Sequence, residues 1–219
     1  MKIDQLEPSS PFYRRCREDL EYLLSQPTIK ELRPCPRCTI PCPCSGSATC
    51  TCGCSHGCLQ APYQMSSDPG RYPIEEKIAP LVYEFYGLRI CEPCWSCEGH
   101  CSSDGQLIKI PQVWFYTRSM LYPRLISEYL EDLLFKKLLT YPWHICITYS
   151  SAAEVDTAFS IEPRLTLVKD PQLELLQKDV ALIAADFIEA IRARAKRYIE
   201  LIDSKVENHD DHKEAGFKG

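Results

Sequence analysis

The chain lacks the apolar segments that export or membrane insertion would require. Charged residues and prolines fill the N-terminus, MKIDQLEPSSPFYRRCRE, where a secretory signal would carry its apolar core. No stretch elsewhere approaches the roughly 20 consecutive apolar residues that span a bilayer. We therefore expect a cytoplasmic protein without membrane contact, in which thiols stay reduced and a disulfide framework is disfavoured.

The sequence also lacks an excess of basic residues and a glycine-rich phosphate loop. The formal net charge is −5, and because nucleic-acid phosphates are bound by basic faces, we do not expect a nucleic-acid partner. Only nine glycines are present, mostly in cysteine-rich tracts or the tail, so nothing indicates nucleotide chemistry. A basic run within a strongly helical segment is interpreted as a solvated helix face. Its members are Arg192, Arg194, Lys196 and Arg197.

Apolar side chains are scarce between residues 35 and 58, whereas cysteine is abundant there. This segment holds one charged residue, Arg37, one large aliphatic residue, Ile40, and no aromatic residue. It therefore cannot build a hydrophobic core, and we expect it to fold only around bound metal. Eight of the chain's 14 cysteines could serve as ligands in this first tract: Cys35, Cys38, Cys42, Cys44, Cys50, Cys52, Cys54 and Cys58.

Closely spaced cysteine pairs give the first tract a resemblance to metallothioneins. The runs 42–44 and 50–54 have the C-x-C pattern. This resemblance implies thiolates shared between adjacent metal ions, as two tetrahedral sites or one larger cluster. Four prolines between residues 34 and 43 remove backbone N–H donors next to the sulfurs, and this favours zinc over an iron–sulfur cluster.

A second tract, CEPCWSCEGHC, has the spacing C-x2-C-x2-C-x3-C and resembles the cluster-binding run of bacterial ferredoxins. Its cysteines are Cys91, Cys94, Cys97 and Cys101. The resemblance implies a four-iron iron–sulfur cluster, although Ser102 replaces the proline of those proteins and the run has no second copy. The alternative is zinc, with Cys91 and Cys94 joined by Cys97, His100 or Cys101. Either way, the spacing predicts that the four sulfurs converge on one centre.

The same region offers residues for catalysis. Cys97, Glu98 and His100 lie close together in sequence, and His144 lies beside another thiol, Cys146. Together they could form an activated thiol or an open zinc site with a general base. The simpler interpretation, which we expect, is that Cys97 is a metal ligand, Glu98 is solvated, and both histidines are satisfied by backbone or packing. Enzymatic activity is left open by the sequence.

The rest of the chain predicts an α+β protein. We expect a small mixed or antiparallel sheet packed with three to five helices, together with an irregular, metal-organised cysteine-rich insertion. The expected organisation is an N-terminal helix in 1–33, the cysteine-rich lobe in 34–62, an α/β core in 63–203 carrying the second tract at 91–101, and a disordered tail in 204–219. Strands are expected within 106–116, 143–149 and 157–168. One long helix over 171–203, about 50 Å in length, predicts a protein partner or a homodimer along it.

The most direct functional hypothesis is a metal-binding protein that acts in interaction, scaffolding or metal and redox handling, with zinc as the ion. One alternative is an iron–sulfur protein that uses the second tract for electron transfer or cluster delivery. The other is a metal- or thiol-dependent enzyme that uses Cys97, Glu98, His100 and His144.

Overall fold

The computed structural model describes residues 10–27, 68, 71–72, 74–150, 157–166 and 168–215. Within these residues the chain forms five helices and a four-stranded antiparallel sheet, so the predicted α+β class is confirmed. The first cysteine tract lies outside the described residues. Metal binding by its eight cysteines therefore stays a prediction.

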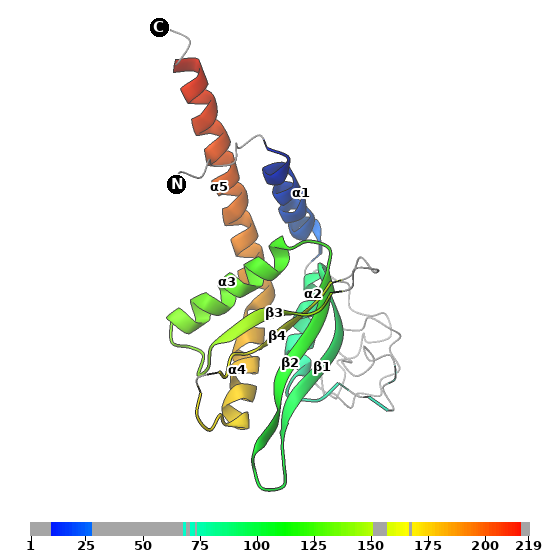
Figure 1. Cartoon of the computed structure of the whole chain (residues 1–219). Coiled ribbons are helices and arrows are strands. Elements are labelled where there is room, and N and C mark those ends of the chain that lie inside the picture. Colours follow the sequence, from blue (N-terminus) through cyan, green and yellow to red (C-terminus); the bar gives the residue numbers. More distant parts are fainter. Residues whose placement is uncertain are drawn as a thin grey trace, which may run out of the picture.

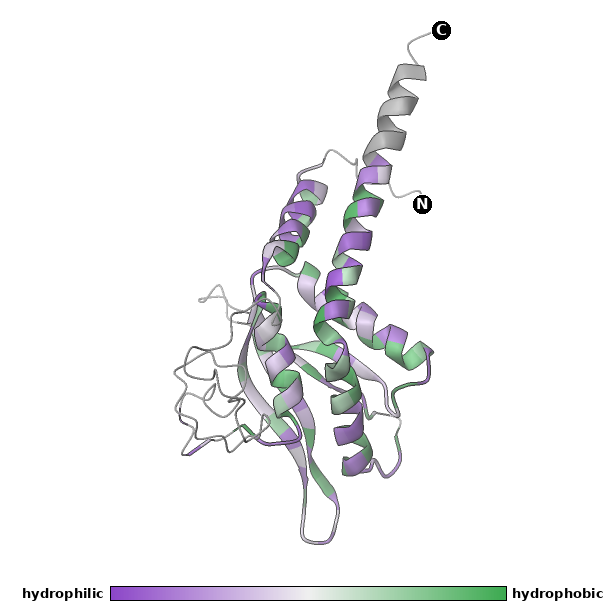
Figure 2. Cartoon of the chain, turned by 180° about the vertical axis from the view of Figure 1, so that it is seen from behind, coloured by the Kyte–Doolittle hydropathy of each residue, from purple (hydrophilic) through white to green (hydrophobic). Residues whose placement is uncertain are grey.

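The sheet has the strand order β1-β2-β4-β3, with every neighbouring pair antiparallel (Figure 1). The strands are β1 (Cys91–Cys101), β2 (Leu107–Thr117), β3 (Trp143–Ser150) and β4 (Thr157–Pro163). The helices are α1 (Pro11–Ser25), α2 (Ala79–Leu88), α3 (Leu121–Phe135), α4 (Leu173–Ala185) and α5 (Phe187–Ala215). Figures 1 and 2, which view the chain from opposite sides, show that α2 and α4 lie against one face of the sheet, while α5 extends beyond the sheet and packs against α1, α2 and α3. None of the helices in the described part of the chain is long and apolar enough to cross a membrane.

The core lies between that face and the helices. Val113 and Phe115 of β2 alternate with more exposed neighbours, because successive strand side chains point to opposite faces. Phe85 of α2 contacts the ring of Phe115 at 4.7 Å and that of Phe187, the first residue of α5, at 4.8 Å between ring centres. Burying each such side chain stabilises the fold by about 2–3 kcal/mol. The helical layer is thereby fixed against the sheet.

The second cysteine tract forms strand β1 rather than the tight metal loop expected from its spacing. It pairs with β2 from Cys91, opposite Thr117, to Cys101, opposite Leu107. The hairpin turn is closed by the Ser102 N–H, which donates to the Gln106 carbonyl at 2.8 Å. The tract is therefore extended by β-pairing along its whole length.

The helix expected over 171–203 is two helices. Asp186 leaves the helical region, with φ −128° and ψ 21°, and separates α4 from α5. Two backbone N–H groups in the first turn of α5 then find acceptors. The Ala190 N–H donates to the Asp186 carbonyl at 2.9 Å, and the Ile188 N–H donates to the Glu84 carboxylate at 3.3 Å. α5 continues through residues 204–215, where the sequence predicts a disordered tail. The predicted partner along this segment stays a prediction.

Two arginines of the basic run make internal contacts, which corrects the interpretation of a solvated face. The Arg192 guanidinium donates to the carbonyl oxygens of Leu23, Leu24 and Gln26 at 3.1, 2.8 and 2.9 Å. It thereby supplies donors to carbonyls at the end of α1, where a helix leaves its last C=O groups short of intrahelical partners; the Leu23 carbonyl also accepts from the Gln26 N–H at 3.3 Å. Arg194 is nearly buried and pairs with Asp132 of α3. These contacts hold α1 and α3 against α5.

Candidate metal centre

The structure does not bring the four sulfurs of the second tract together. Cys91 and Cys97 are buried, whereas Cys94 and Cys101 are exposed. At about 3.3 Å per residue, the strand separates Cys91 from Cys101 by roughly 30 Å. The expected convergence on one four-sulfur centre is therefore corrected, because β-pairing keeps the tract extended. Metal binding by each of these four cysteines separately stays a prediction.

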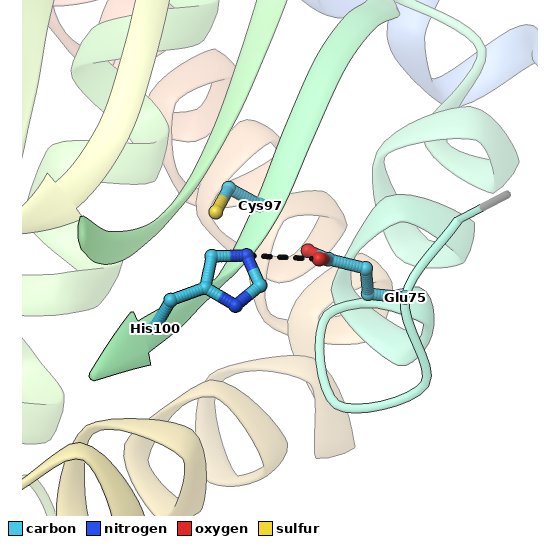
Figure 3. Close-up of side chains that lie close together, drawn as sticks. All are labelled: Glu75, Cys97 and His100. Carbon is cyan, nitrogen blue, oxygen red and sulfur yellow. Dashed lines mark ion pairs between the residues drawn. The ribbon is translucent and has the colours of Figure 1, made fainter. Parts of the chain in front are cut away.

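Cys97 instead lies beside a histidine of its own strand and a carboxylate from another segment. The Cys97 sulfur, a ring nitrogen of His100 and a carboxylate oxygen of Glu75 all lie within 4.8 Å of one another (Figure 3). The His100 Nε2 and Glu75 Oε1 are 2.9 Å apart. Glu75 comes from the turn before α2, so the group joins two elements that are not neighbours along the chain.

Backbone hydrogen bonds fix the position of Glu75. Its Oε2 accepts from the Glu98 N–H at 2.7 Å, and the Glu98 carboxylate in turn accepts from the Lys77 N–H at 2.8 Å. From α4, the Gln177 amide donates to the Glu98 carbonyl at 3.1 Å. Glu98 is therefore engaged in joining β1 to the turn before α2, rather than being simply solvated as expected. We refer to these contacts between Glu75, Lys77 and Glu98 as the clasp.

Gly99 shapes the chain between Cys97 and His100. Its φ is +84°, a conformation that residues with a side chain rarely adopt. A Cβ at this position would lie 2.6 Å from the Leu173 Cδ1 and 2.9 Å from the Pro111 Cδ. Only glycine fits both the backbone angle and the space, so this residue sets the local shape of the site.

The environment of Cys97 favours the protonated thiol in the absence of a cation. Burial is the largest influence and raises the pKa of the thiol, while a hydrogen bond from the Gly99 N–H opposes the rise and the charge of Glu75 adds to it. A bound cation would reverse this balance, because a coordinating thiol is deprotonated by the metal's own charge.

The three donors suit a small tetrahedral ion. Zinc bond lengths of about 2.0 Å to nitrogen or oxygen and 2.3 Å to sulfur place tetrahedral ligand atoms roughly 3.3–3.5 Å apart. The separation of His100 Nε2 from Glu75 Oε1, 2.9 Å, is shorter than this range, and no two of the three donor atoms are more than 4.8 Å apart. The His100 and Glu75 side chains are 40% and 32% exposed, so solvent reaches the site. Small side-chain movements would complete three ligands and leave a fourth position for an exchangeable group.

His144 does not join this group. It lies on β3, at the edge of the sheet opposite β1, with β2 and β4 between them. Its neighbours are Cys146 on the same strand and Glu162 on β4, which together form a second three-donor group. The set Cys97, Glu98, His100 and His144 is thus divided between the two edges of the sheet. The catalytic alternative required one pocket that joins Glu98, His100 and His144, and the strand order instead places His144 at the other edge of the sheet from Glu98 and His100.

Sequence reasoning missed the two carboxylates, Glu75 and Glu162. Glu75 belongs to the run Glu75-Glu76-Lys77, which has the composition of an exposed helix start, and Glu162 precedes a proline at the end of a strand. Neither glutamate stands in the sequence at a spacing from a cysteine or histidine that is typical of a metal site. Only the folding of the chain brings these carboxylates to their partners.

Comparisons of the chain with known protein families, with curated proteins and with solved structures each found no match. Function therefore has to be inferred from the residues and their geometry.

Proposed function

We propose that this protein binds zinc through Glu75, Cys97 and His100 and acts in metal handling. The observation that supports the proposal is the meeting of one thiol, one imidazole and one carboxylate within 4.8 Å, brought together from two elements. These are the three side-chain types that bind zinc in proteins.

The donor types discriminate between ions. An iron–sulfur cluster is held by several thiolates, whereas this group offers a single sulfur. Calcium and magnesium prefer sites made entirely of oxygen ligands. A mixed sulfur, nitrogen and oxygen set therefore favours zinc or another divalent ion of similar softness.

The number of donors bears on what the site does. Structural zinc sites have four protein ligands, whereas three protein ligands leave a position for water, substrate or a second protein's ligand. Partial exposure of His100 and Glu75 makes exchange of the ion possible. Reversible binding and delivery of zinc is consistent with these features and with the eight further cysteines at 35–58.

A second candidate function is a zinc-dependent hydrolase, which the open fourth position favours because zinc-bound water ionises near neutral pH. A general base is also needed for this chemistry. Glu98, the nearest candidate in sequence, is engaged with the Lys77 N–H, and His144 lies at the other edge of the sheet. These contacts favour metal handling over hydrolysis.

The proposal is tested by comparing two cysteines of one strand. The full chain, reduced and purified without oxygen, is equilibrated with buffered zinc, and bound metal is counted by elemental analysis. Cys97→Ser and His100→Gln should each lose about one zinc ion per chain, since a ligand is removed. Cys94→Ser is the matched control, because Cys94 is exposed on β1 and belongs to neither three-donor group.

Other outcomes would identify other sites. Equal losses in Cys94→Ser and Cys97→Ser would indicate a four-thiolate centre, and brown, iron-containing protein would indicate the iron–sulfur alternative. Full zinc content in both Cys97→Ser and His100→Gln would contradict the proposal. His100→Gln keeps the test informative if substitution of the buried Cys97 disturbs folding.

A further inference from the structure

We propose that His144, Cys146 and Glu162 form a second, independent binding site for a zinc-class divalent cation, on the β3–β4 ladder. This inference goes beyond the site on β1, because it uses different residues at the opposite edge of the sheet. Each of the three residues offers one ligand atom, and these atoms lie within 4.8 Å of one another.

The strand register builds this site. His144 lies directly opposite Glu162, and Cys146 lies directly opposite Ser160. Residues two apart on a strand share a face, and so do directly paired residues on antiparallel strands. The four side chains therefore occupy the corners of one patch on the sheet.

Distances within the patch are already close to those of a metal site. The His144 Nε2 and the Glu162 Oε1 are 3.7 Å apart, compared with roughly 3.3 Å for two tetrahedral zinc ligands. This separation is longer than a direct hydrogen bond. A cation between the two atoms would need only small side-chain rotations and no change in the backbone.

Ser160 positions the carboxylate. It is fully buried, and its hydroxyl donates to the Glu162 Oε2 at 2.8 Å. The other oxygen, Oε1, is left facing His144. Hydrogen bonds of this kind orient the ligands of known metal sites and strengthen metal binding.

The chemistry of Cys146 argues against a role as an activated nucleophile. Burial is the main cause that raises the pKa of its thiol to about 11, and the charge and hydrogen bonding of Glu162 add to the rise. A catalytic thiol next to a histidine needs a lowered pKa. A metal ion would instead displace the proton and neutralise the adjacent carboxylate.

The second site is tested by mapping cysteine alkylation in the full chain. Reduced, metal-free protein is treated with N-ethylmaleimide with and without zinc, and the rate at Cys146 is followed by peptide mass spectrometry. At a free zinc concentration roughly 100 times the Kd, the unliganded form falls about 100-fold, so alkylation of Cys146 should slow by a similar factor. Cys16 is the internal control, because it is half-buried on α1 and belongs to neither three-donor group.

Three variants assign the protection to this site. His144→Gln and Glu162→Gln should each restore rapid alkylation of Cys146 in the presence of zinc, while Ser160→Ala should weaken zinc binding about 10-fold. Circular dichroism of each variant checks that it is folded. If one of the two variants His144→Gln and Glu162→Gln does not fold, the other still tests the site.

Two results would overturn the proposal: Cys146 alkylation unchanged by zinc, or protection that persists in both ligand variants. Unchanged zinc affinity in Ser160→Ala would show that Ser160 does not position the Glu162 carboxylate for zinc binding. The outcome is separable from that of the β1 site, which is measured by the zinc lost in Cys97→Ser. Either site can fail while the other stands.

Discussion

The two edges of the sheet carry similar ligand types but assemble them in different ways. On β1, Cys97 and His100 come from one strand distorted at Gly99, and Glu75 is delivered by a distant turn. On the β3–β4 ladder, regular strand pairing places His144 and Cys146 against residues of the neighbouring strand. The first group depends on an exception to strand geometry, whereas the second depends on its regularity.

This difference predicts which substitutions should disturb each three-donor group. The β1 group should be sensitive to changes at single positions, because one glycine and the clasp define it. Outside its three donors and Ser160, the β3–β4 group should tolerate single substitutions, and it should respond to changes that alter where β3 begins or how it pairs. The predictions below use this contrast.

The largest effect is expected at Asp179, which is fully buried on α4 and anchors the start of β3. Its carboxylate accepts hydrogen bonds from the Thr140 N–H and the Tyr141 N–H, both at 2.9 Å, and from the Trp143 indole N–H at 3.2 Å. Asp179→Ala would leave three donors without their acceptor, and we expect a loss of roughly 4 kcal/mol in the free energy of unfolding.

Urea unfolding measures this loss, and Asp179→Asn, which keeps one acceptor oxygen, should lose less. Under native conditions Asp179→Ala should also weaken zinc protection of Cys146 more than it lowers zinc bound at Cys97. Equal effects at both edges would show that the anchor is not specific to the β3–β4 ladder.

The next largest effect separates two glycines of the same hairpin. Both Gly99 and Gly105 have φ +84°, but a Cβ would clash with Leu173 and Pro111 at Gly99 and would meet nothing within 4 Å at Gly105. Gly99→Ala should therefore destabilise the protein by roughly 2–3 kcal/mol, from backbone strain plus overpacking. Gly105→Ala should cost about 1 kcal/mol, from backbone strain alone.

Thermal or urea unfolding of the two variants gives the comparison. Gly99→Ala should also reduce zinc binding at the β1 group while leaving protection of Cys146 intact. Equal destabilisation by the two substitutions would contradict the close packing around Gly99.

Alkaline pH tests the packing of α3 in the core, through two buried tyrosines of that helix. Burial raises the pKa of Tyr122 and of Tyr129 to about 12 each. In the unfolded chain tyrosine ionises near pH 10, so between about pH 10 and 12 the folded state holds more protons than the unfolded state. Stability should therefore be unaffected below this window and fall as pH rises through it, with each tyrosine contributing about 1 kcal/mol of loss by pH 11.

Tyr129→Phe isolates one of these contributions. The Tyr129 hydroxyl donates at 2.9 Å to the Ile183 carbonyl near the end of α4, so the variant loses a hydrogen bond worth about 1 kcal/mol at neutral pH. Its stability should then fall less steeply with pH than that of the unmodified chain. Parallel urea unfolding series at pH 8, 10 and 11 measure the slopes, and identical slopes would contradict the assignment.

The smallest effect is expected at an exposed ion pair far from both edges. Arg17 of α1 pairs with Asp203 of α5 at 2.6 Å, and the two side chains are 40% and 41% exposed. Arg17→Gln should leave the free energy of unfolding almost unchanged, because solvent and salt screen such pairs. Zinc binding at either edge should also be unaltered, and a change there would show that α1 influences the sheet.

Local sequence signals predicted much of the fold because the relevant interactions are local. Serine is a good N-cap and proline suits the first helical turn, so the pair Ser10-Pro11 indicates a helix start; α1 begins at Pro11, and the Ser10 hydroxyl accepts from the Tyr13 N–H at 3.5 Å. Pro80 can only kink a helix or lie near its beginning, because proline lacks the N–H that a helix interior needs, and it lies in the first turn of α2. Periodic apolar residues likewise indicated α3, and β-branched and aromatic residues indicated β2, β3 and β4.

The same kind of signal failed at β1 and at Asp186. Cysteine spacing in the second tract matches that of metal loops, but spacing cannot reveal that β2 pairs with all of it. The break at Asp186 lies inside an uninterrupted helical pattern, and beyond it the Ile188 N–H donates to Glu84 of α2. Both regions make contacts between residues far apart in the sequence.

By itself the sequence determined the α+β class, most of the helices and strands, and a chain rich in cysteine, a side chain of the type that can bind metal. Tertiary structure alone decided which of those side chains meet. Cys97 meets Glu75 because the clasp ties a distant turn to β1, and His144 meets Glu162 because β3 pairs with β4 in one particular register. The physical reason is that helix capping and strand propensity act over a few residues, whereas a three-donor group needs atoms within a few ångströms from segments whose proximity is set by packing of the whole core.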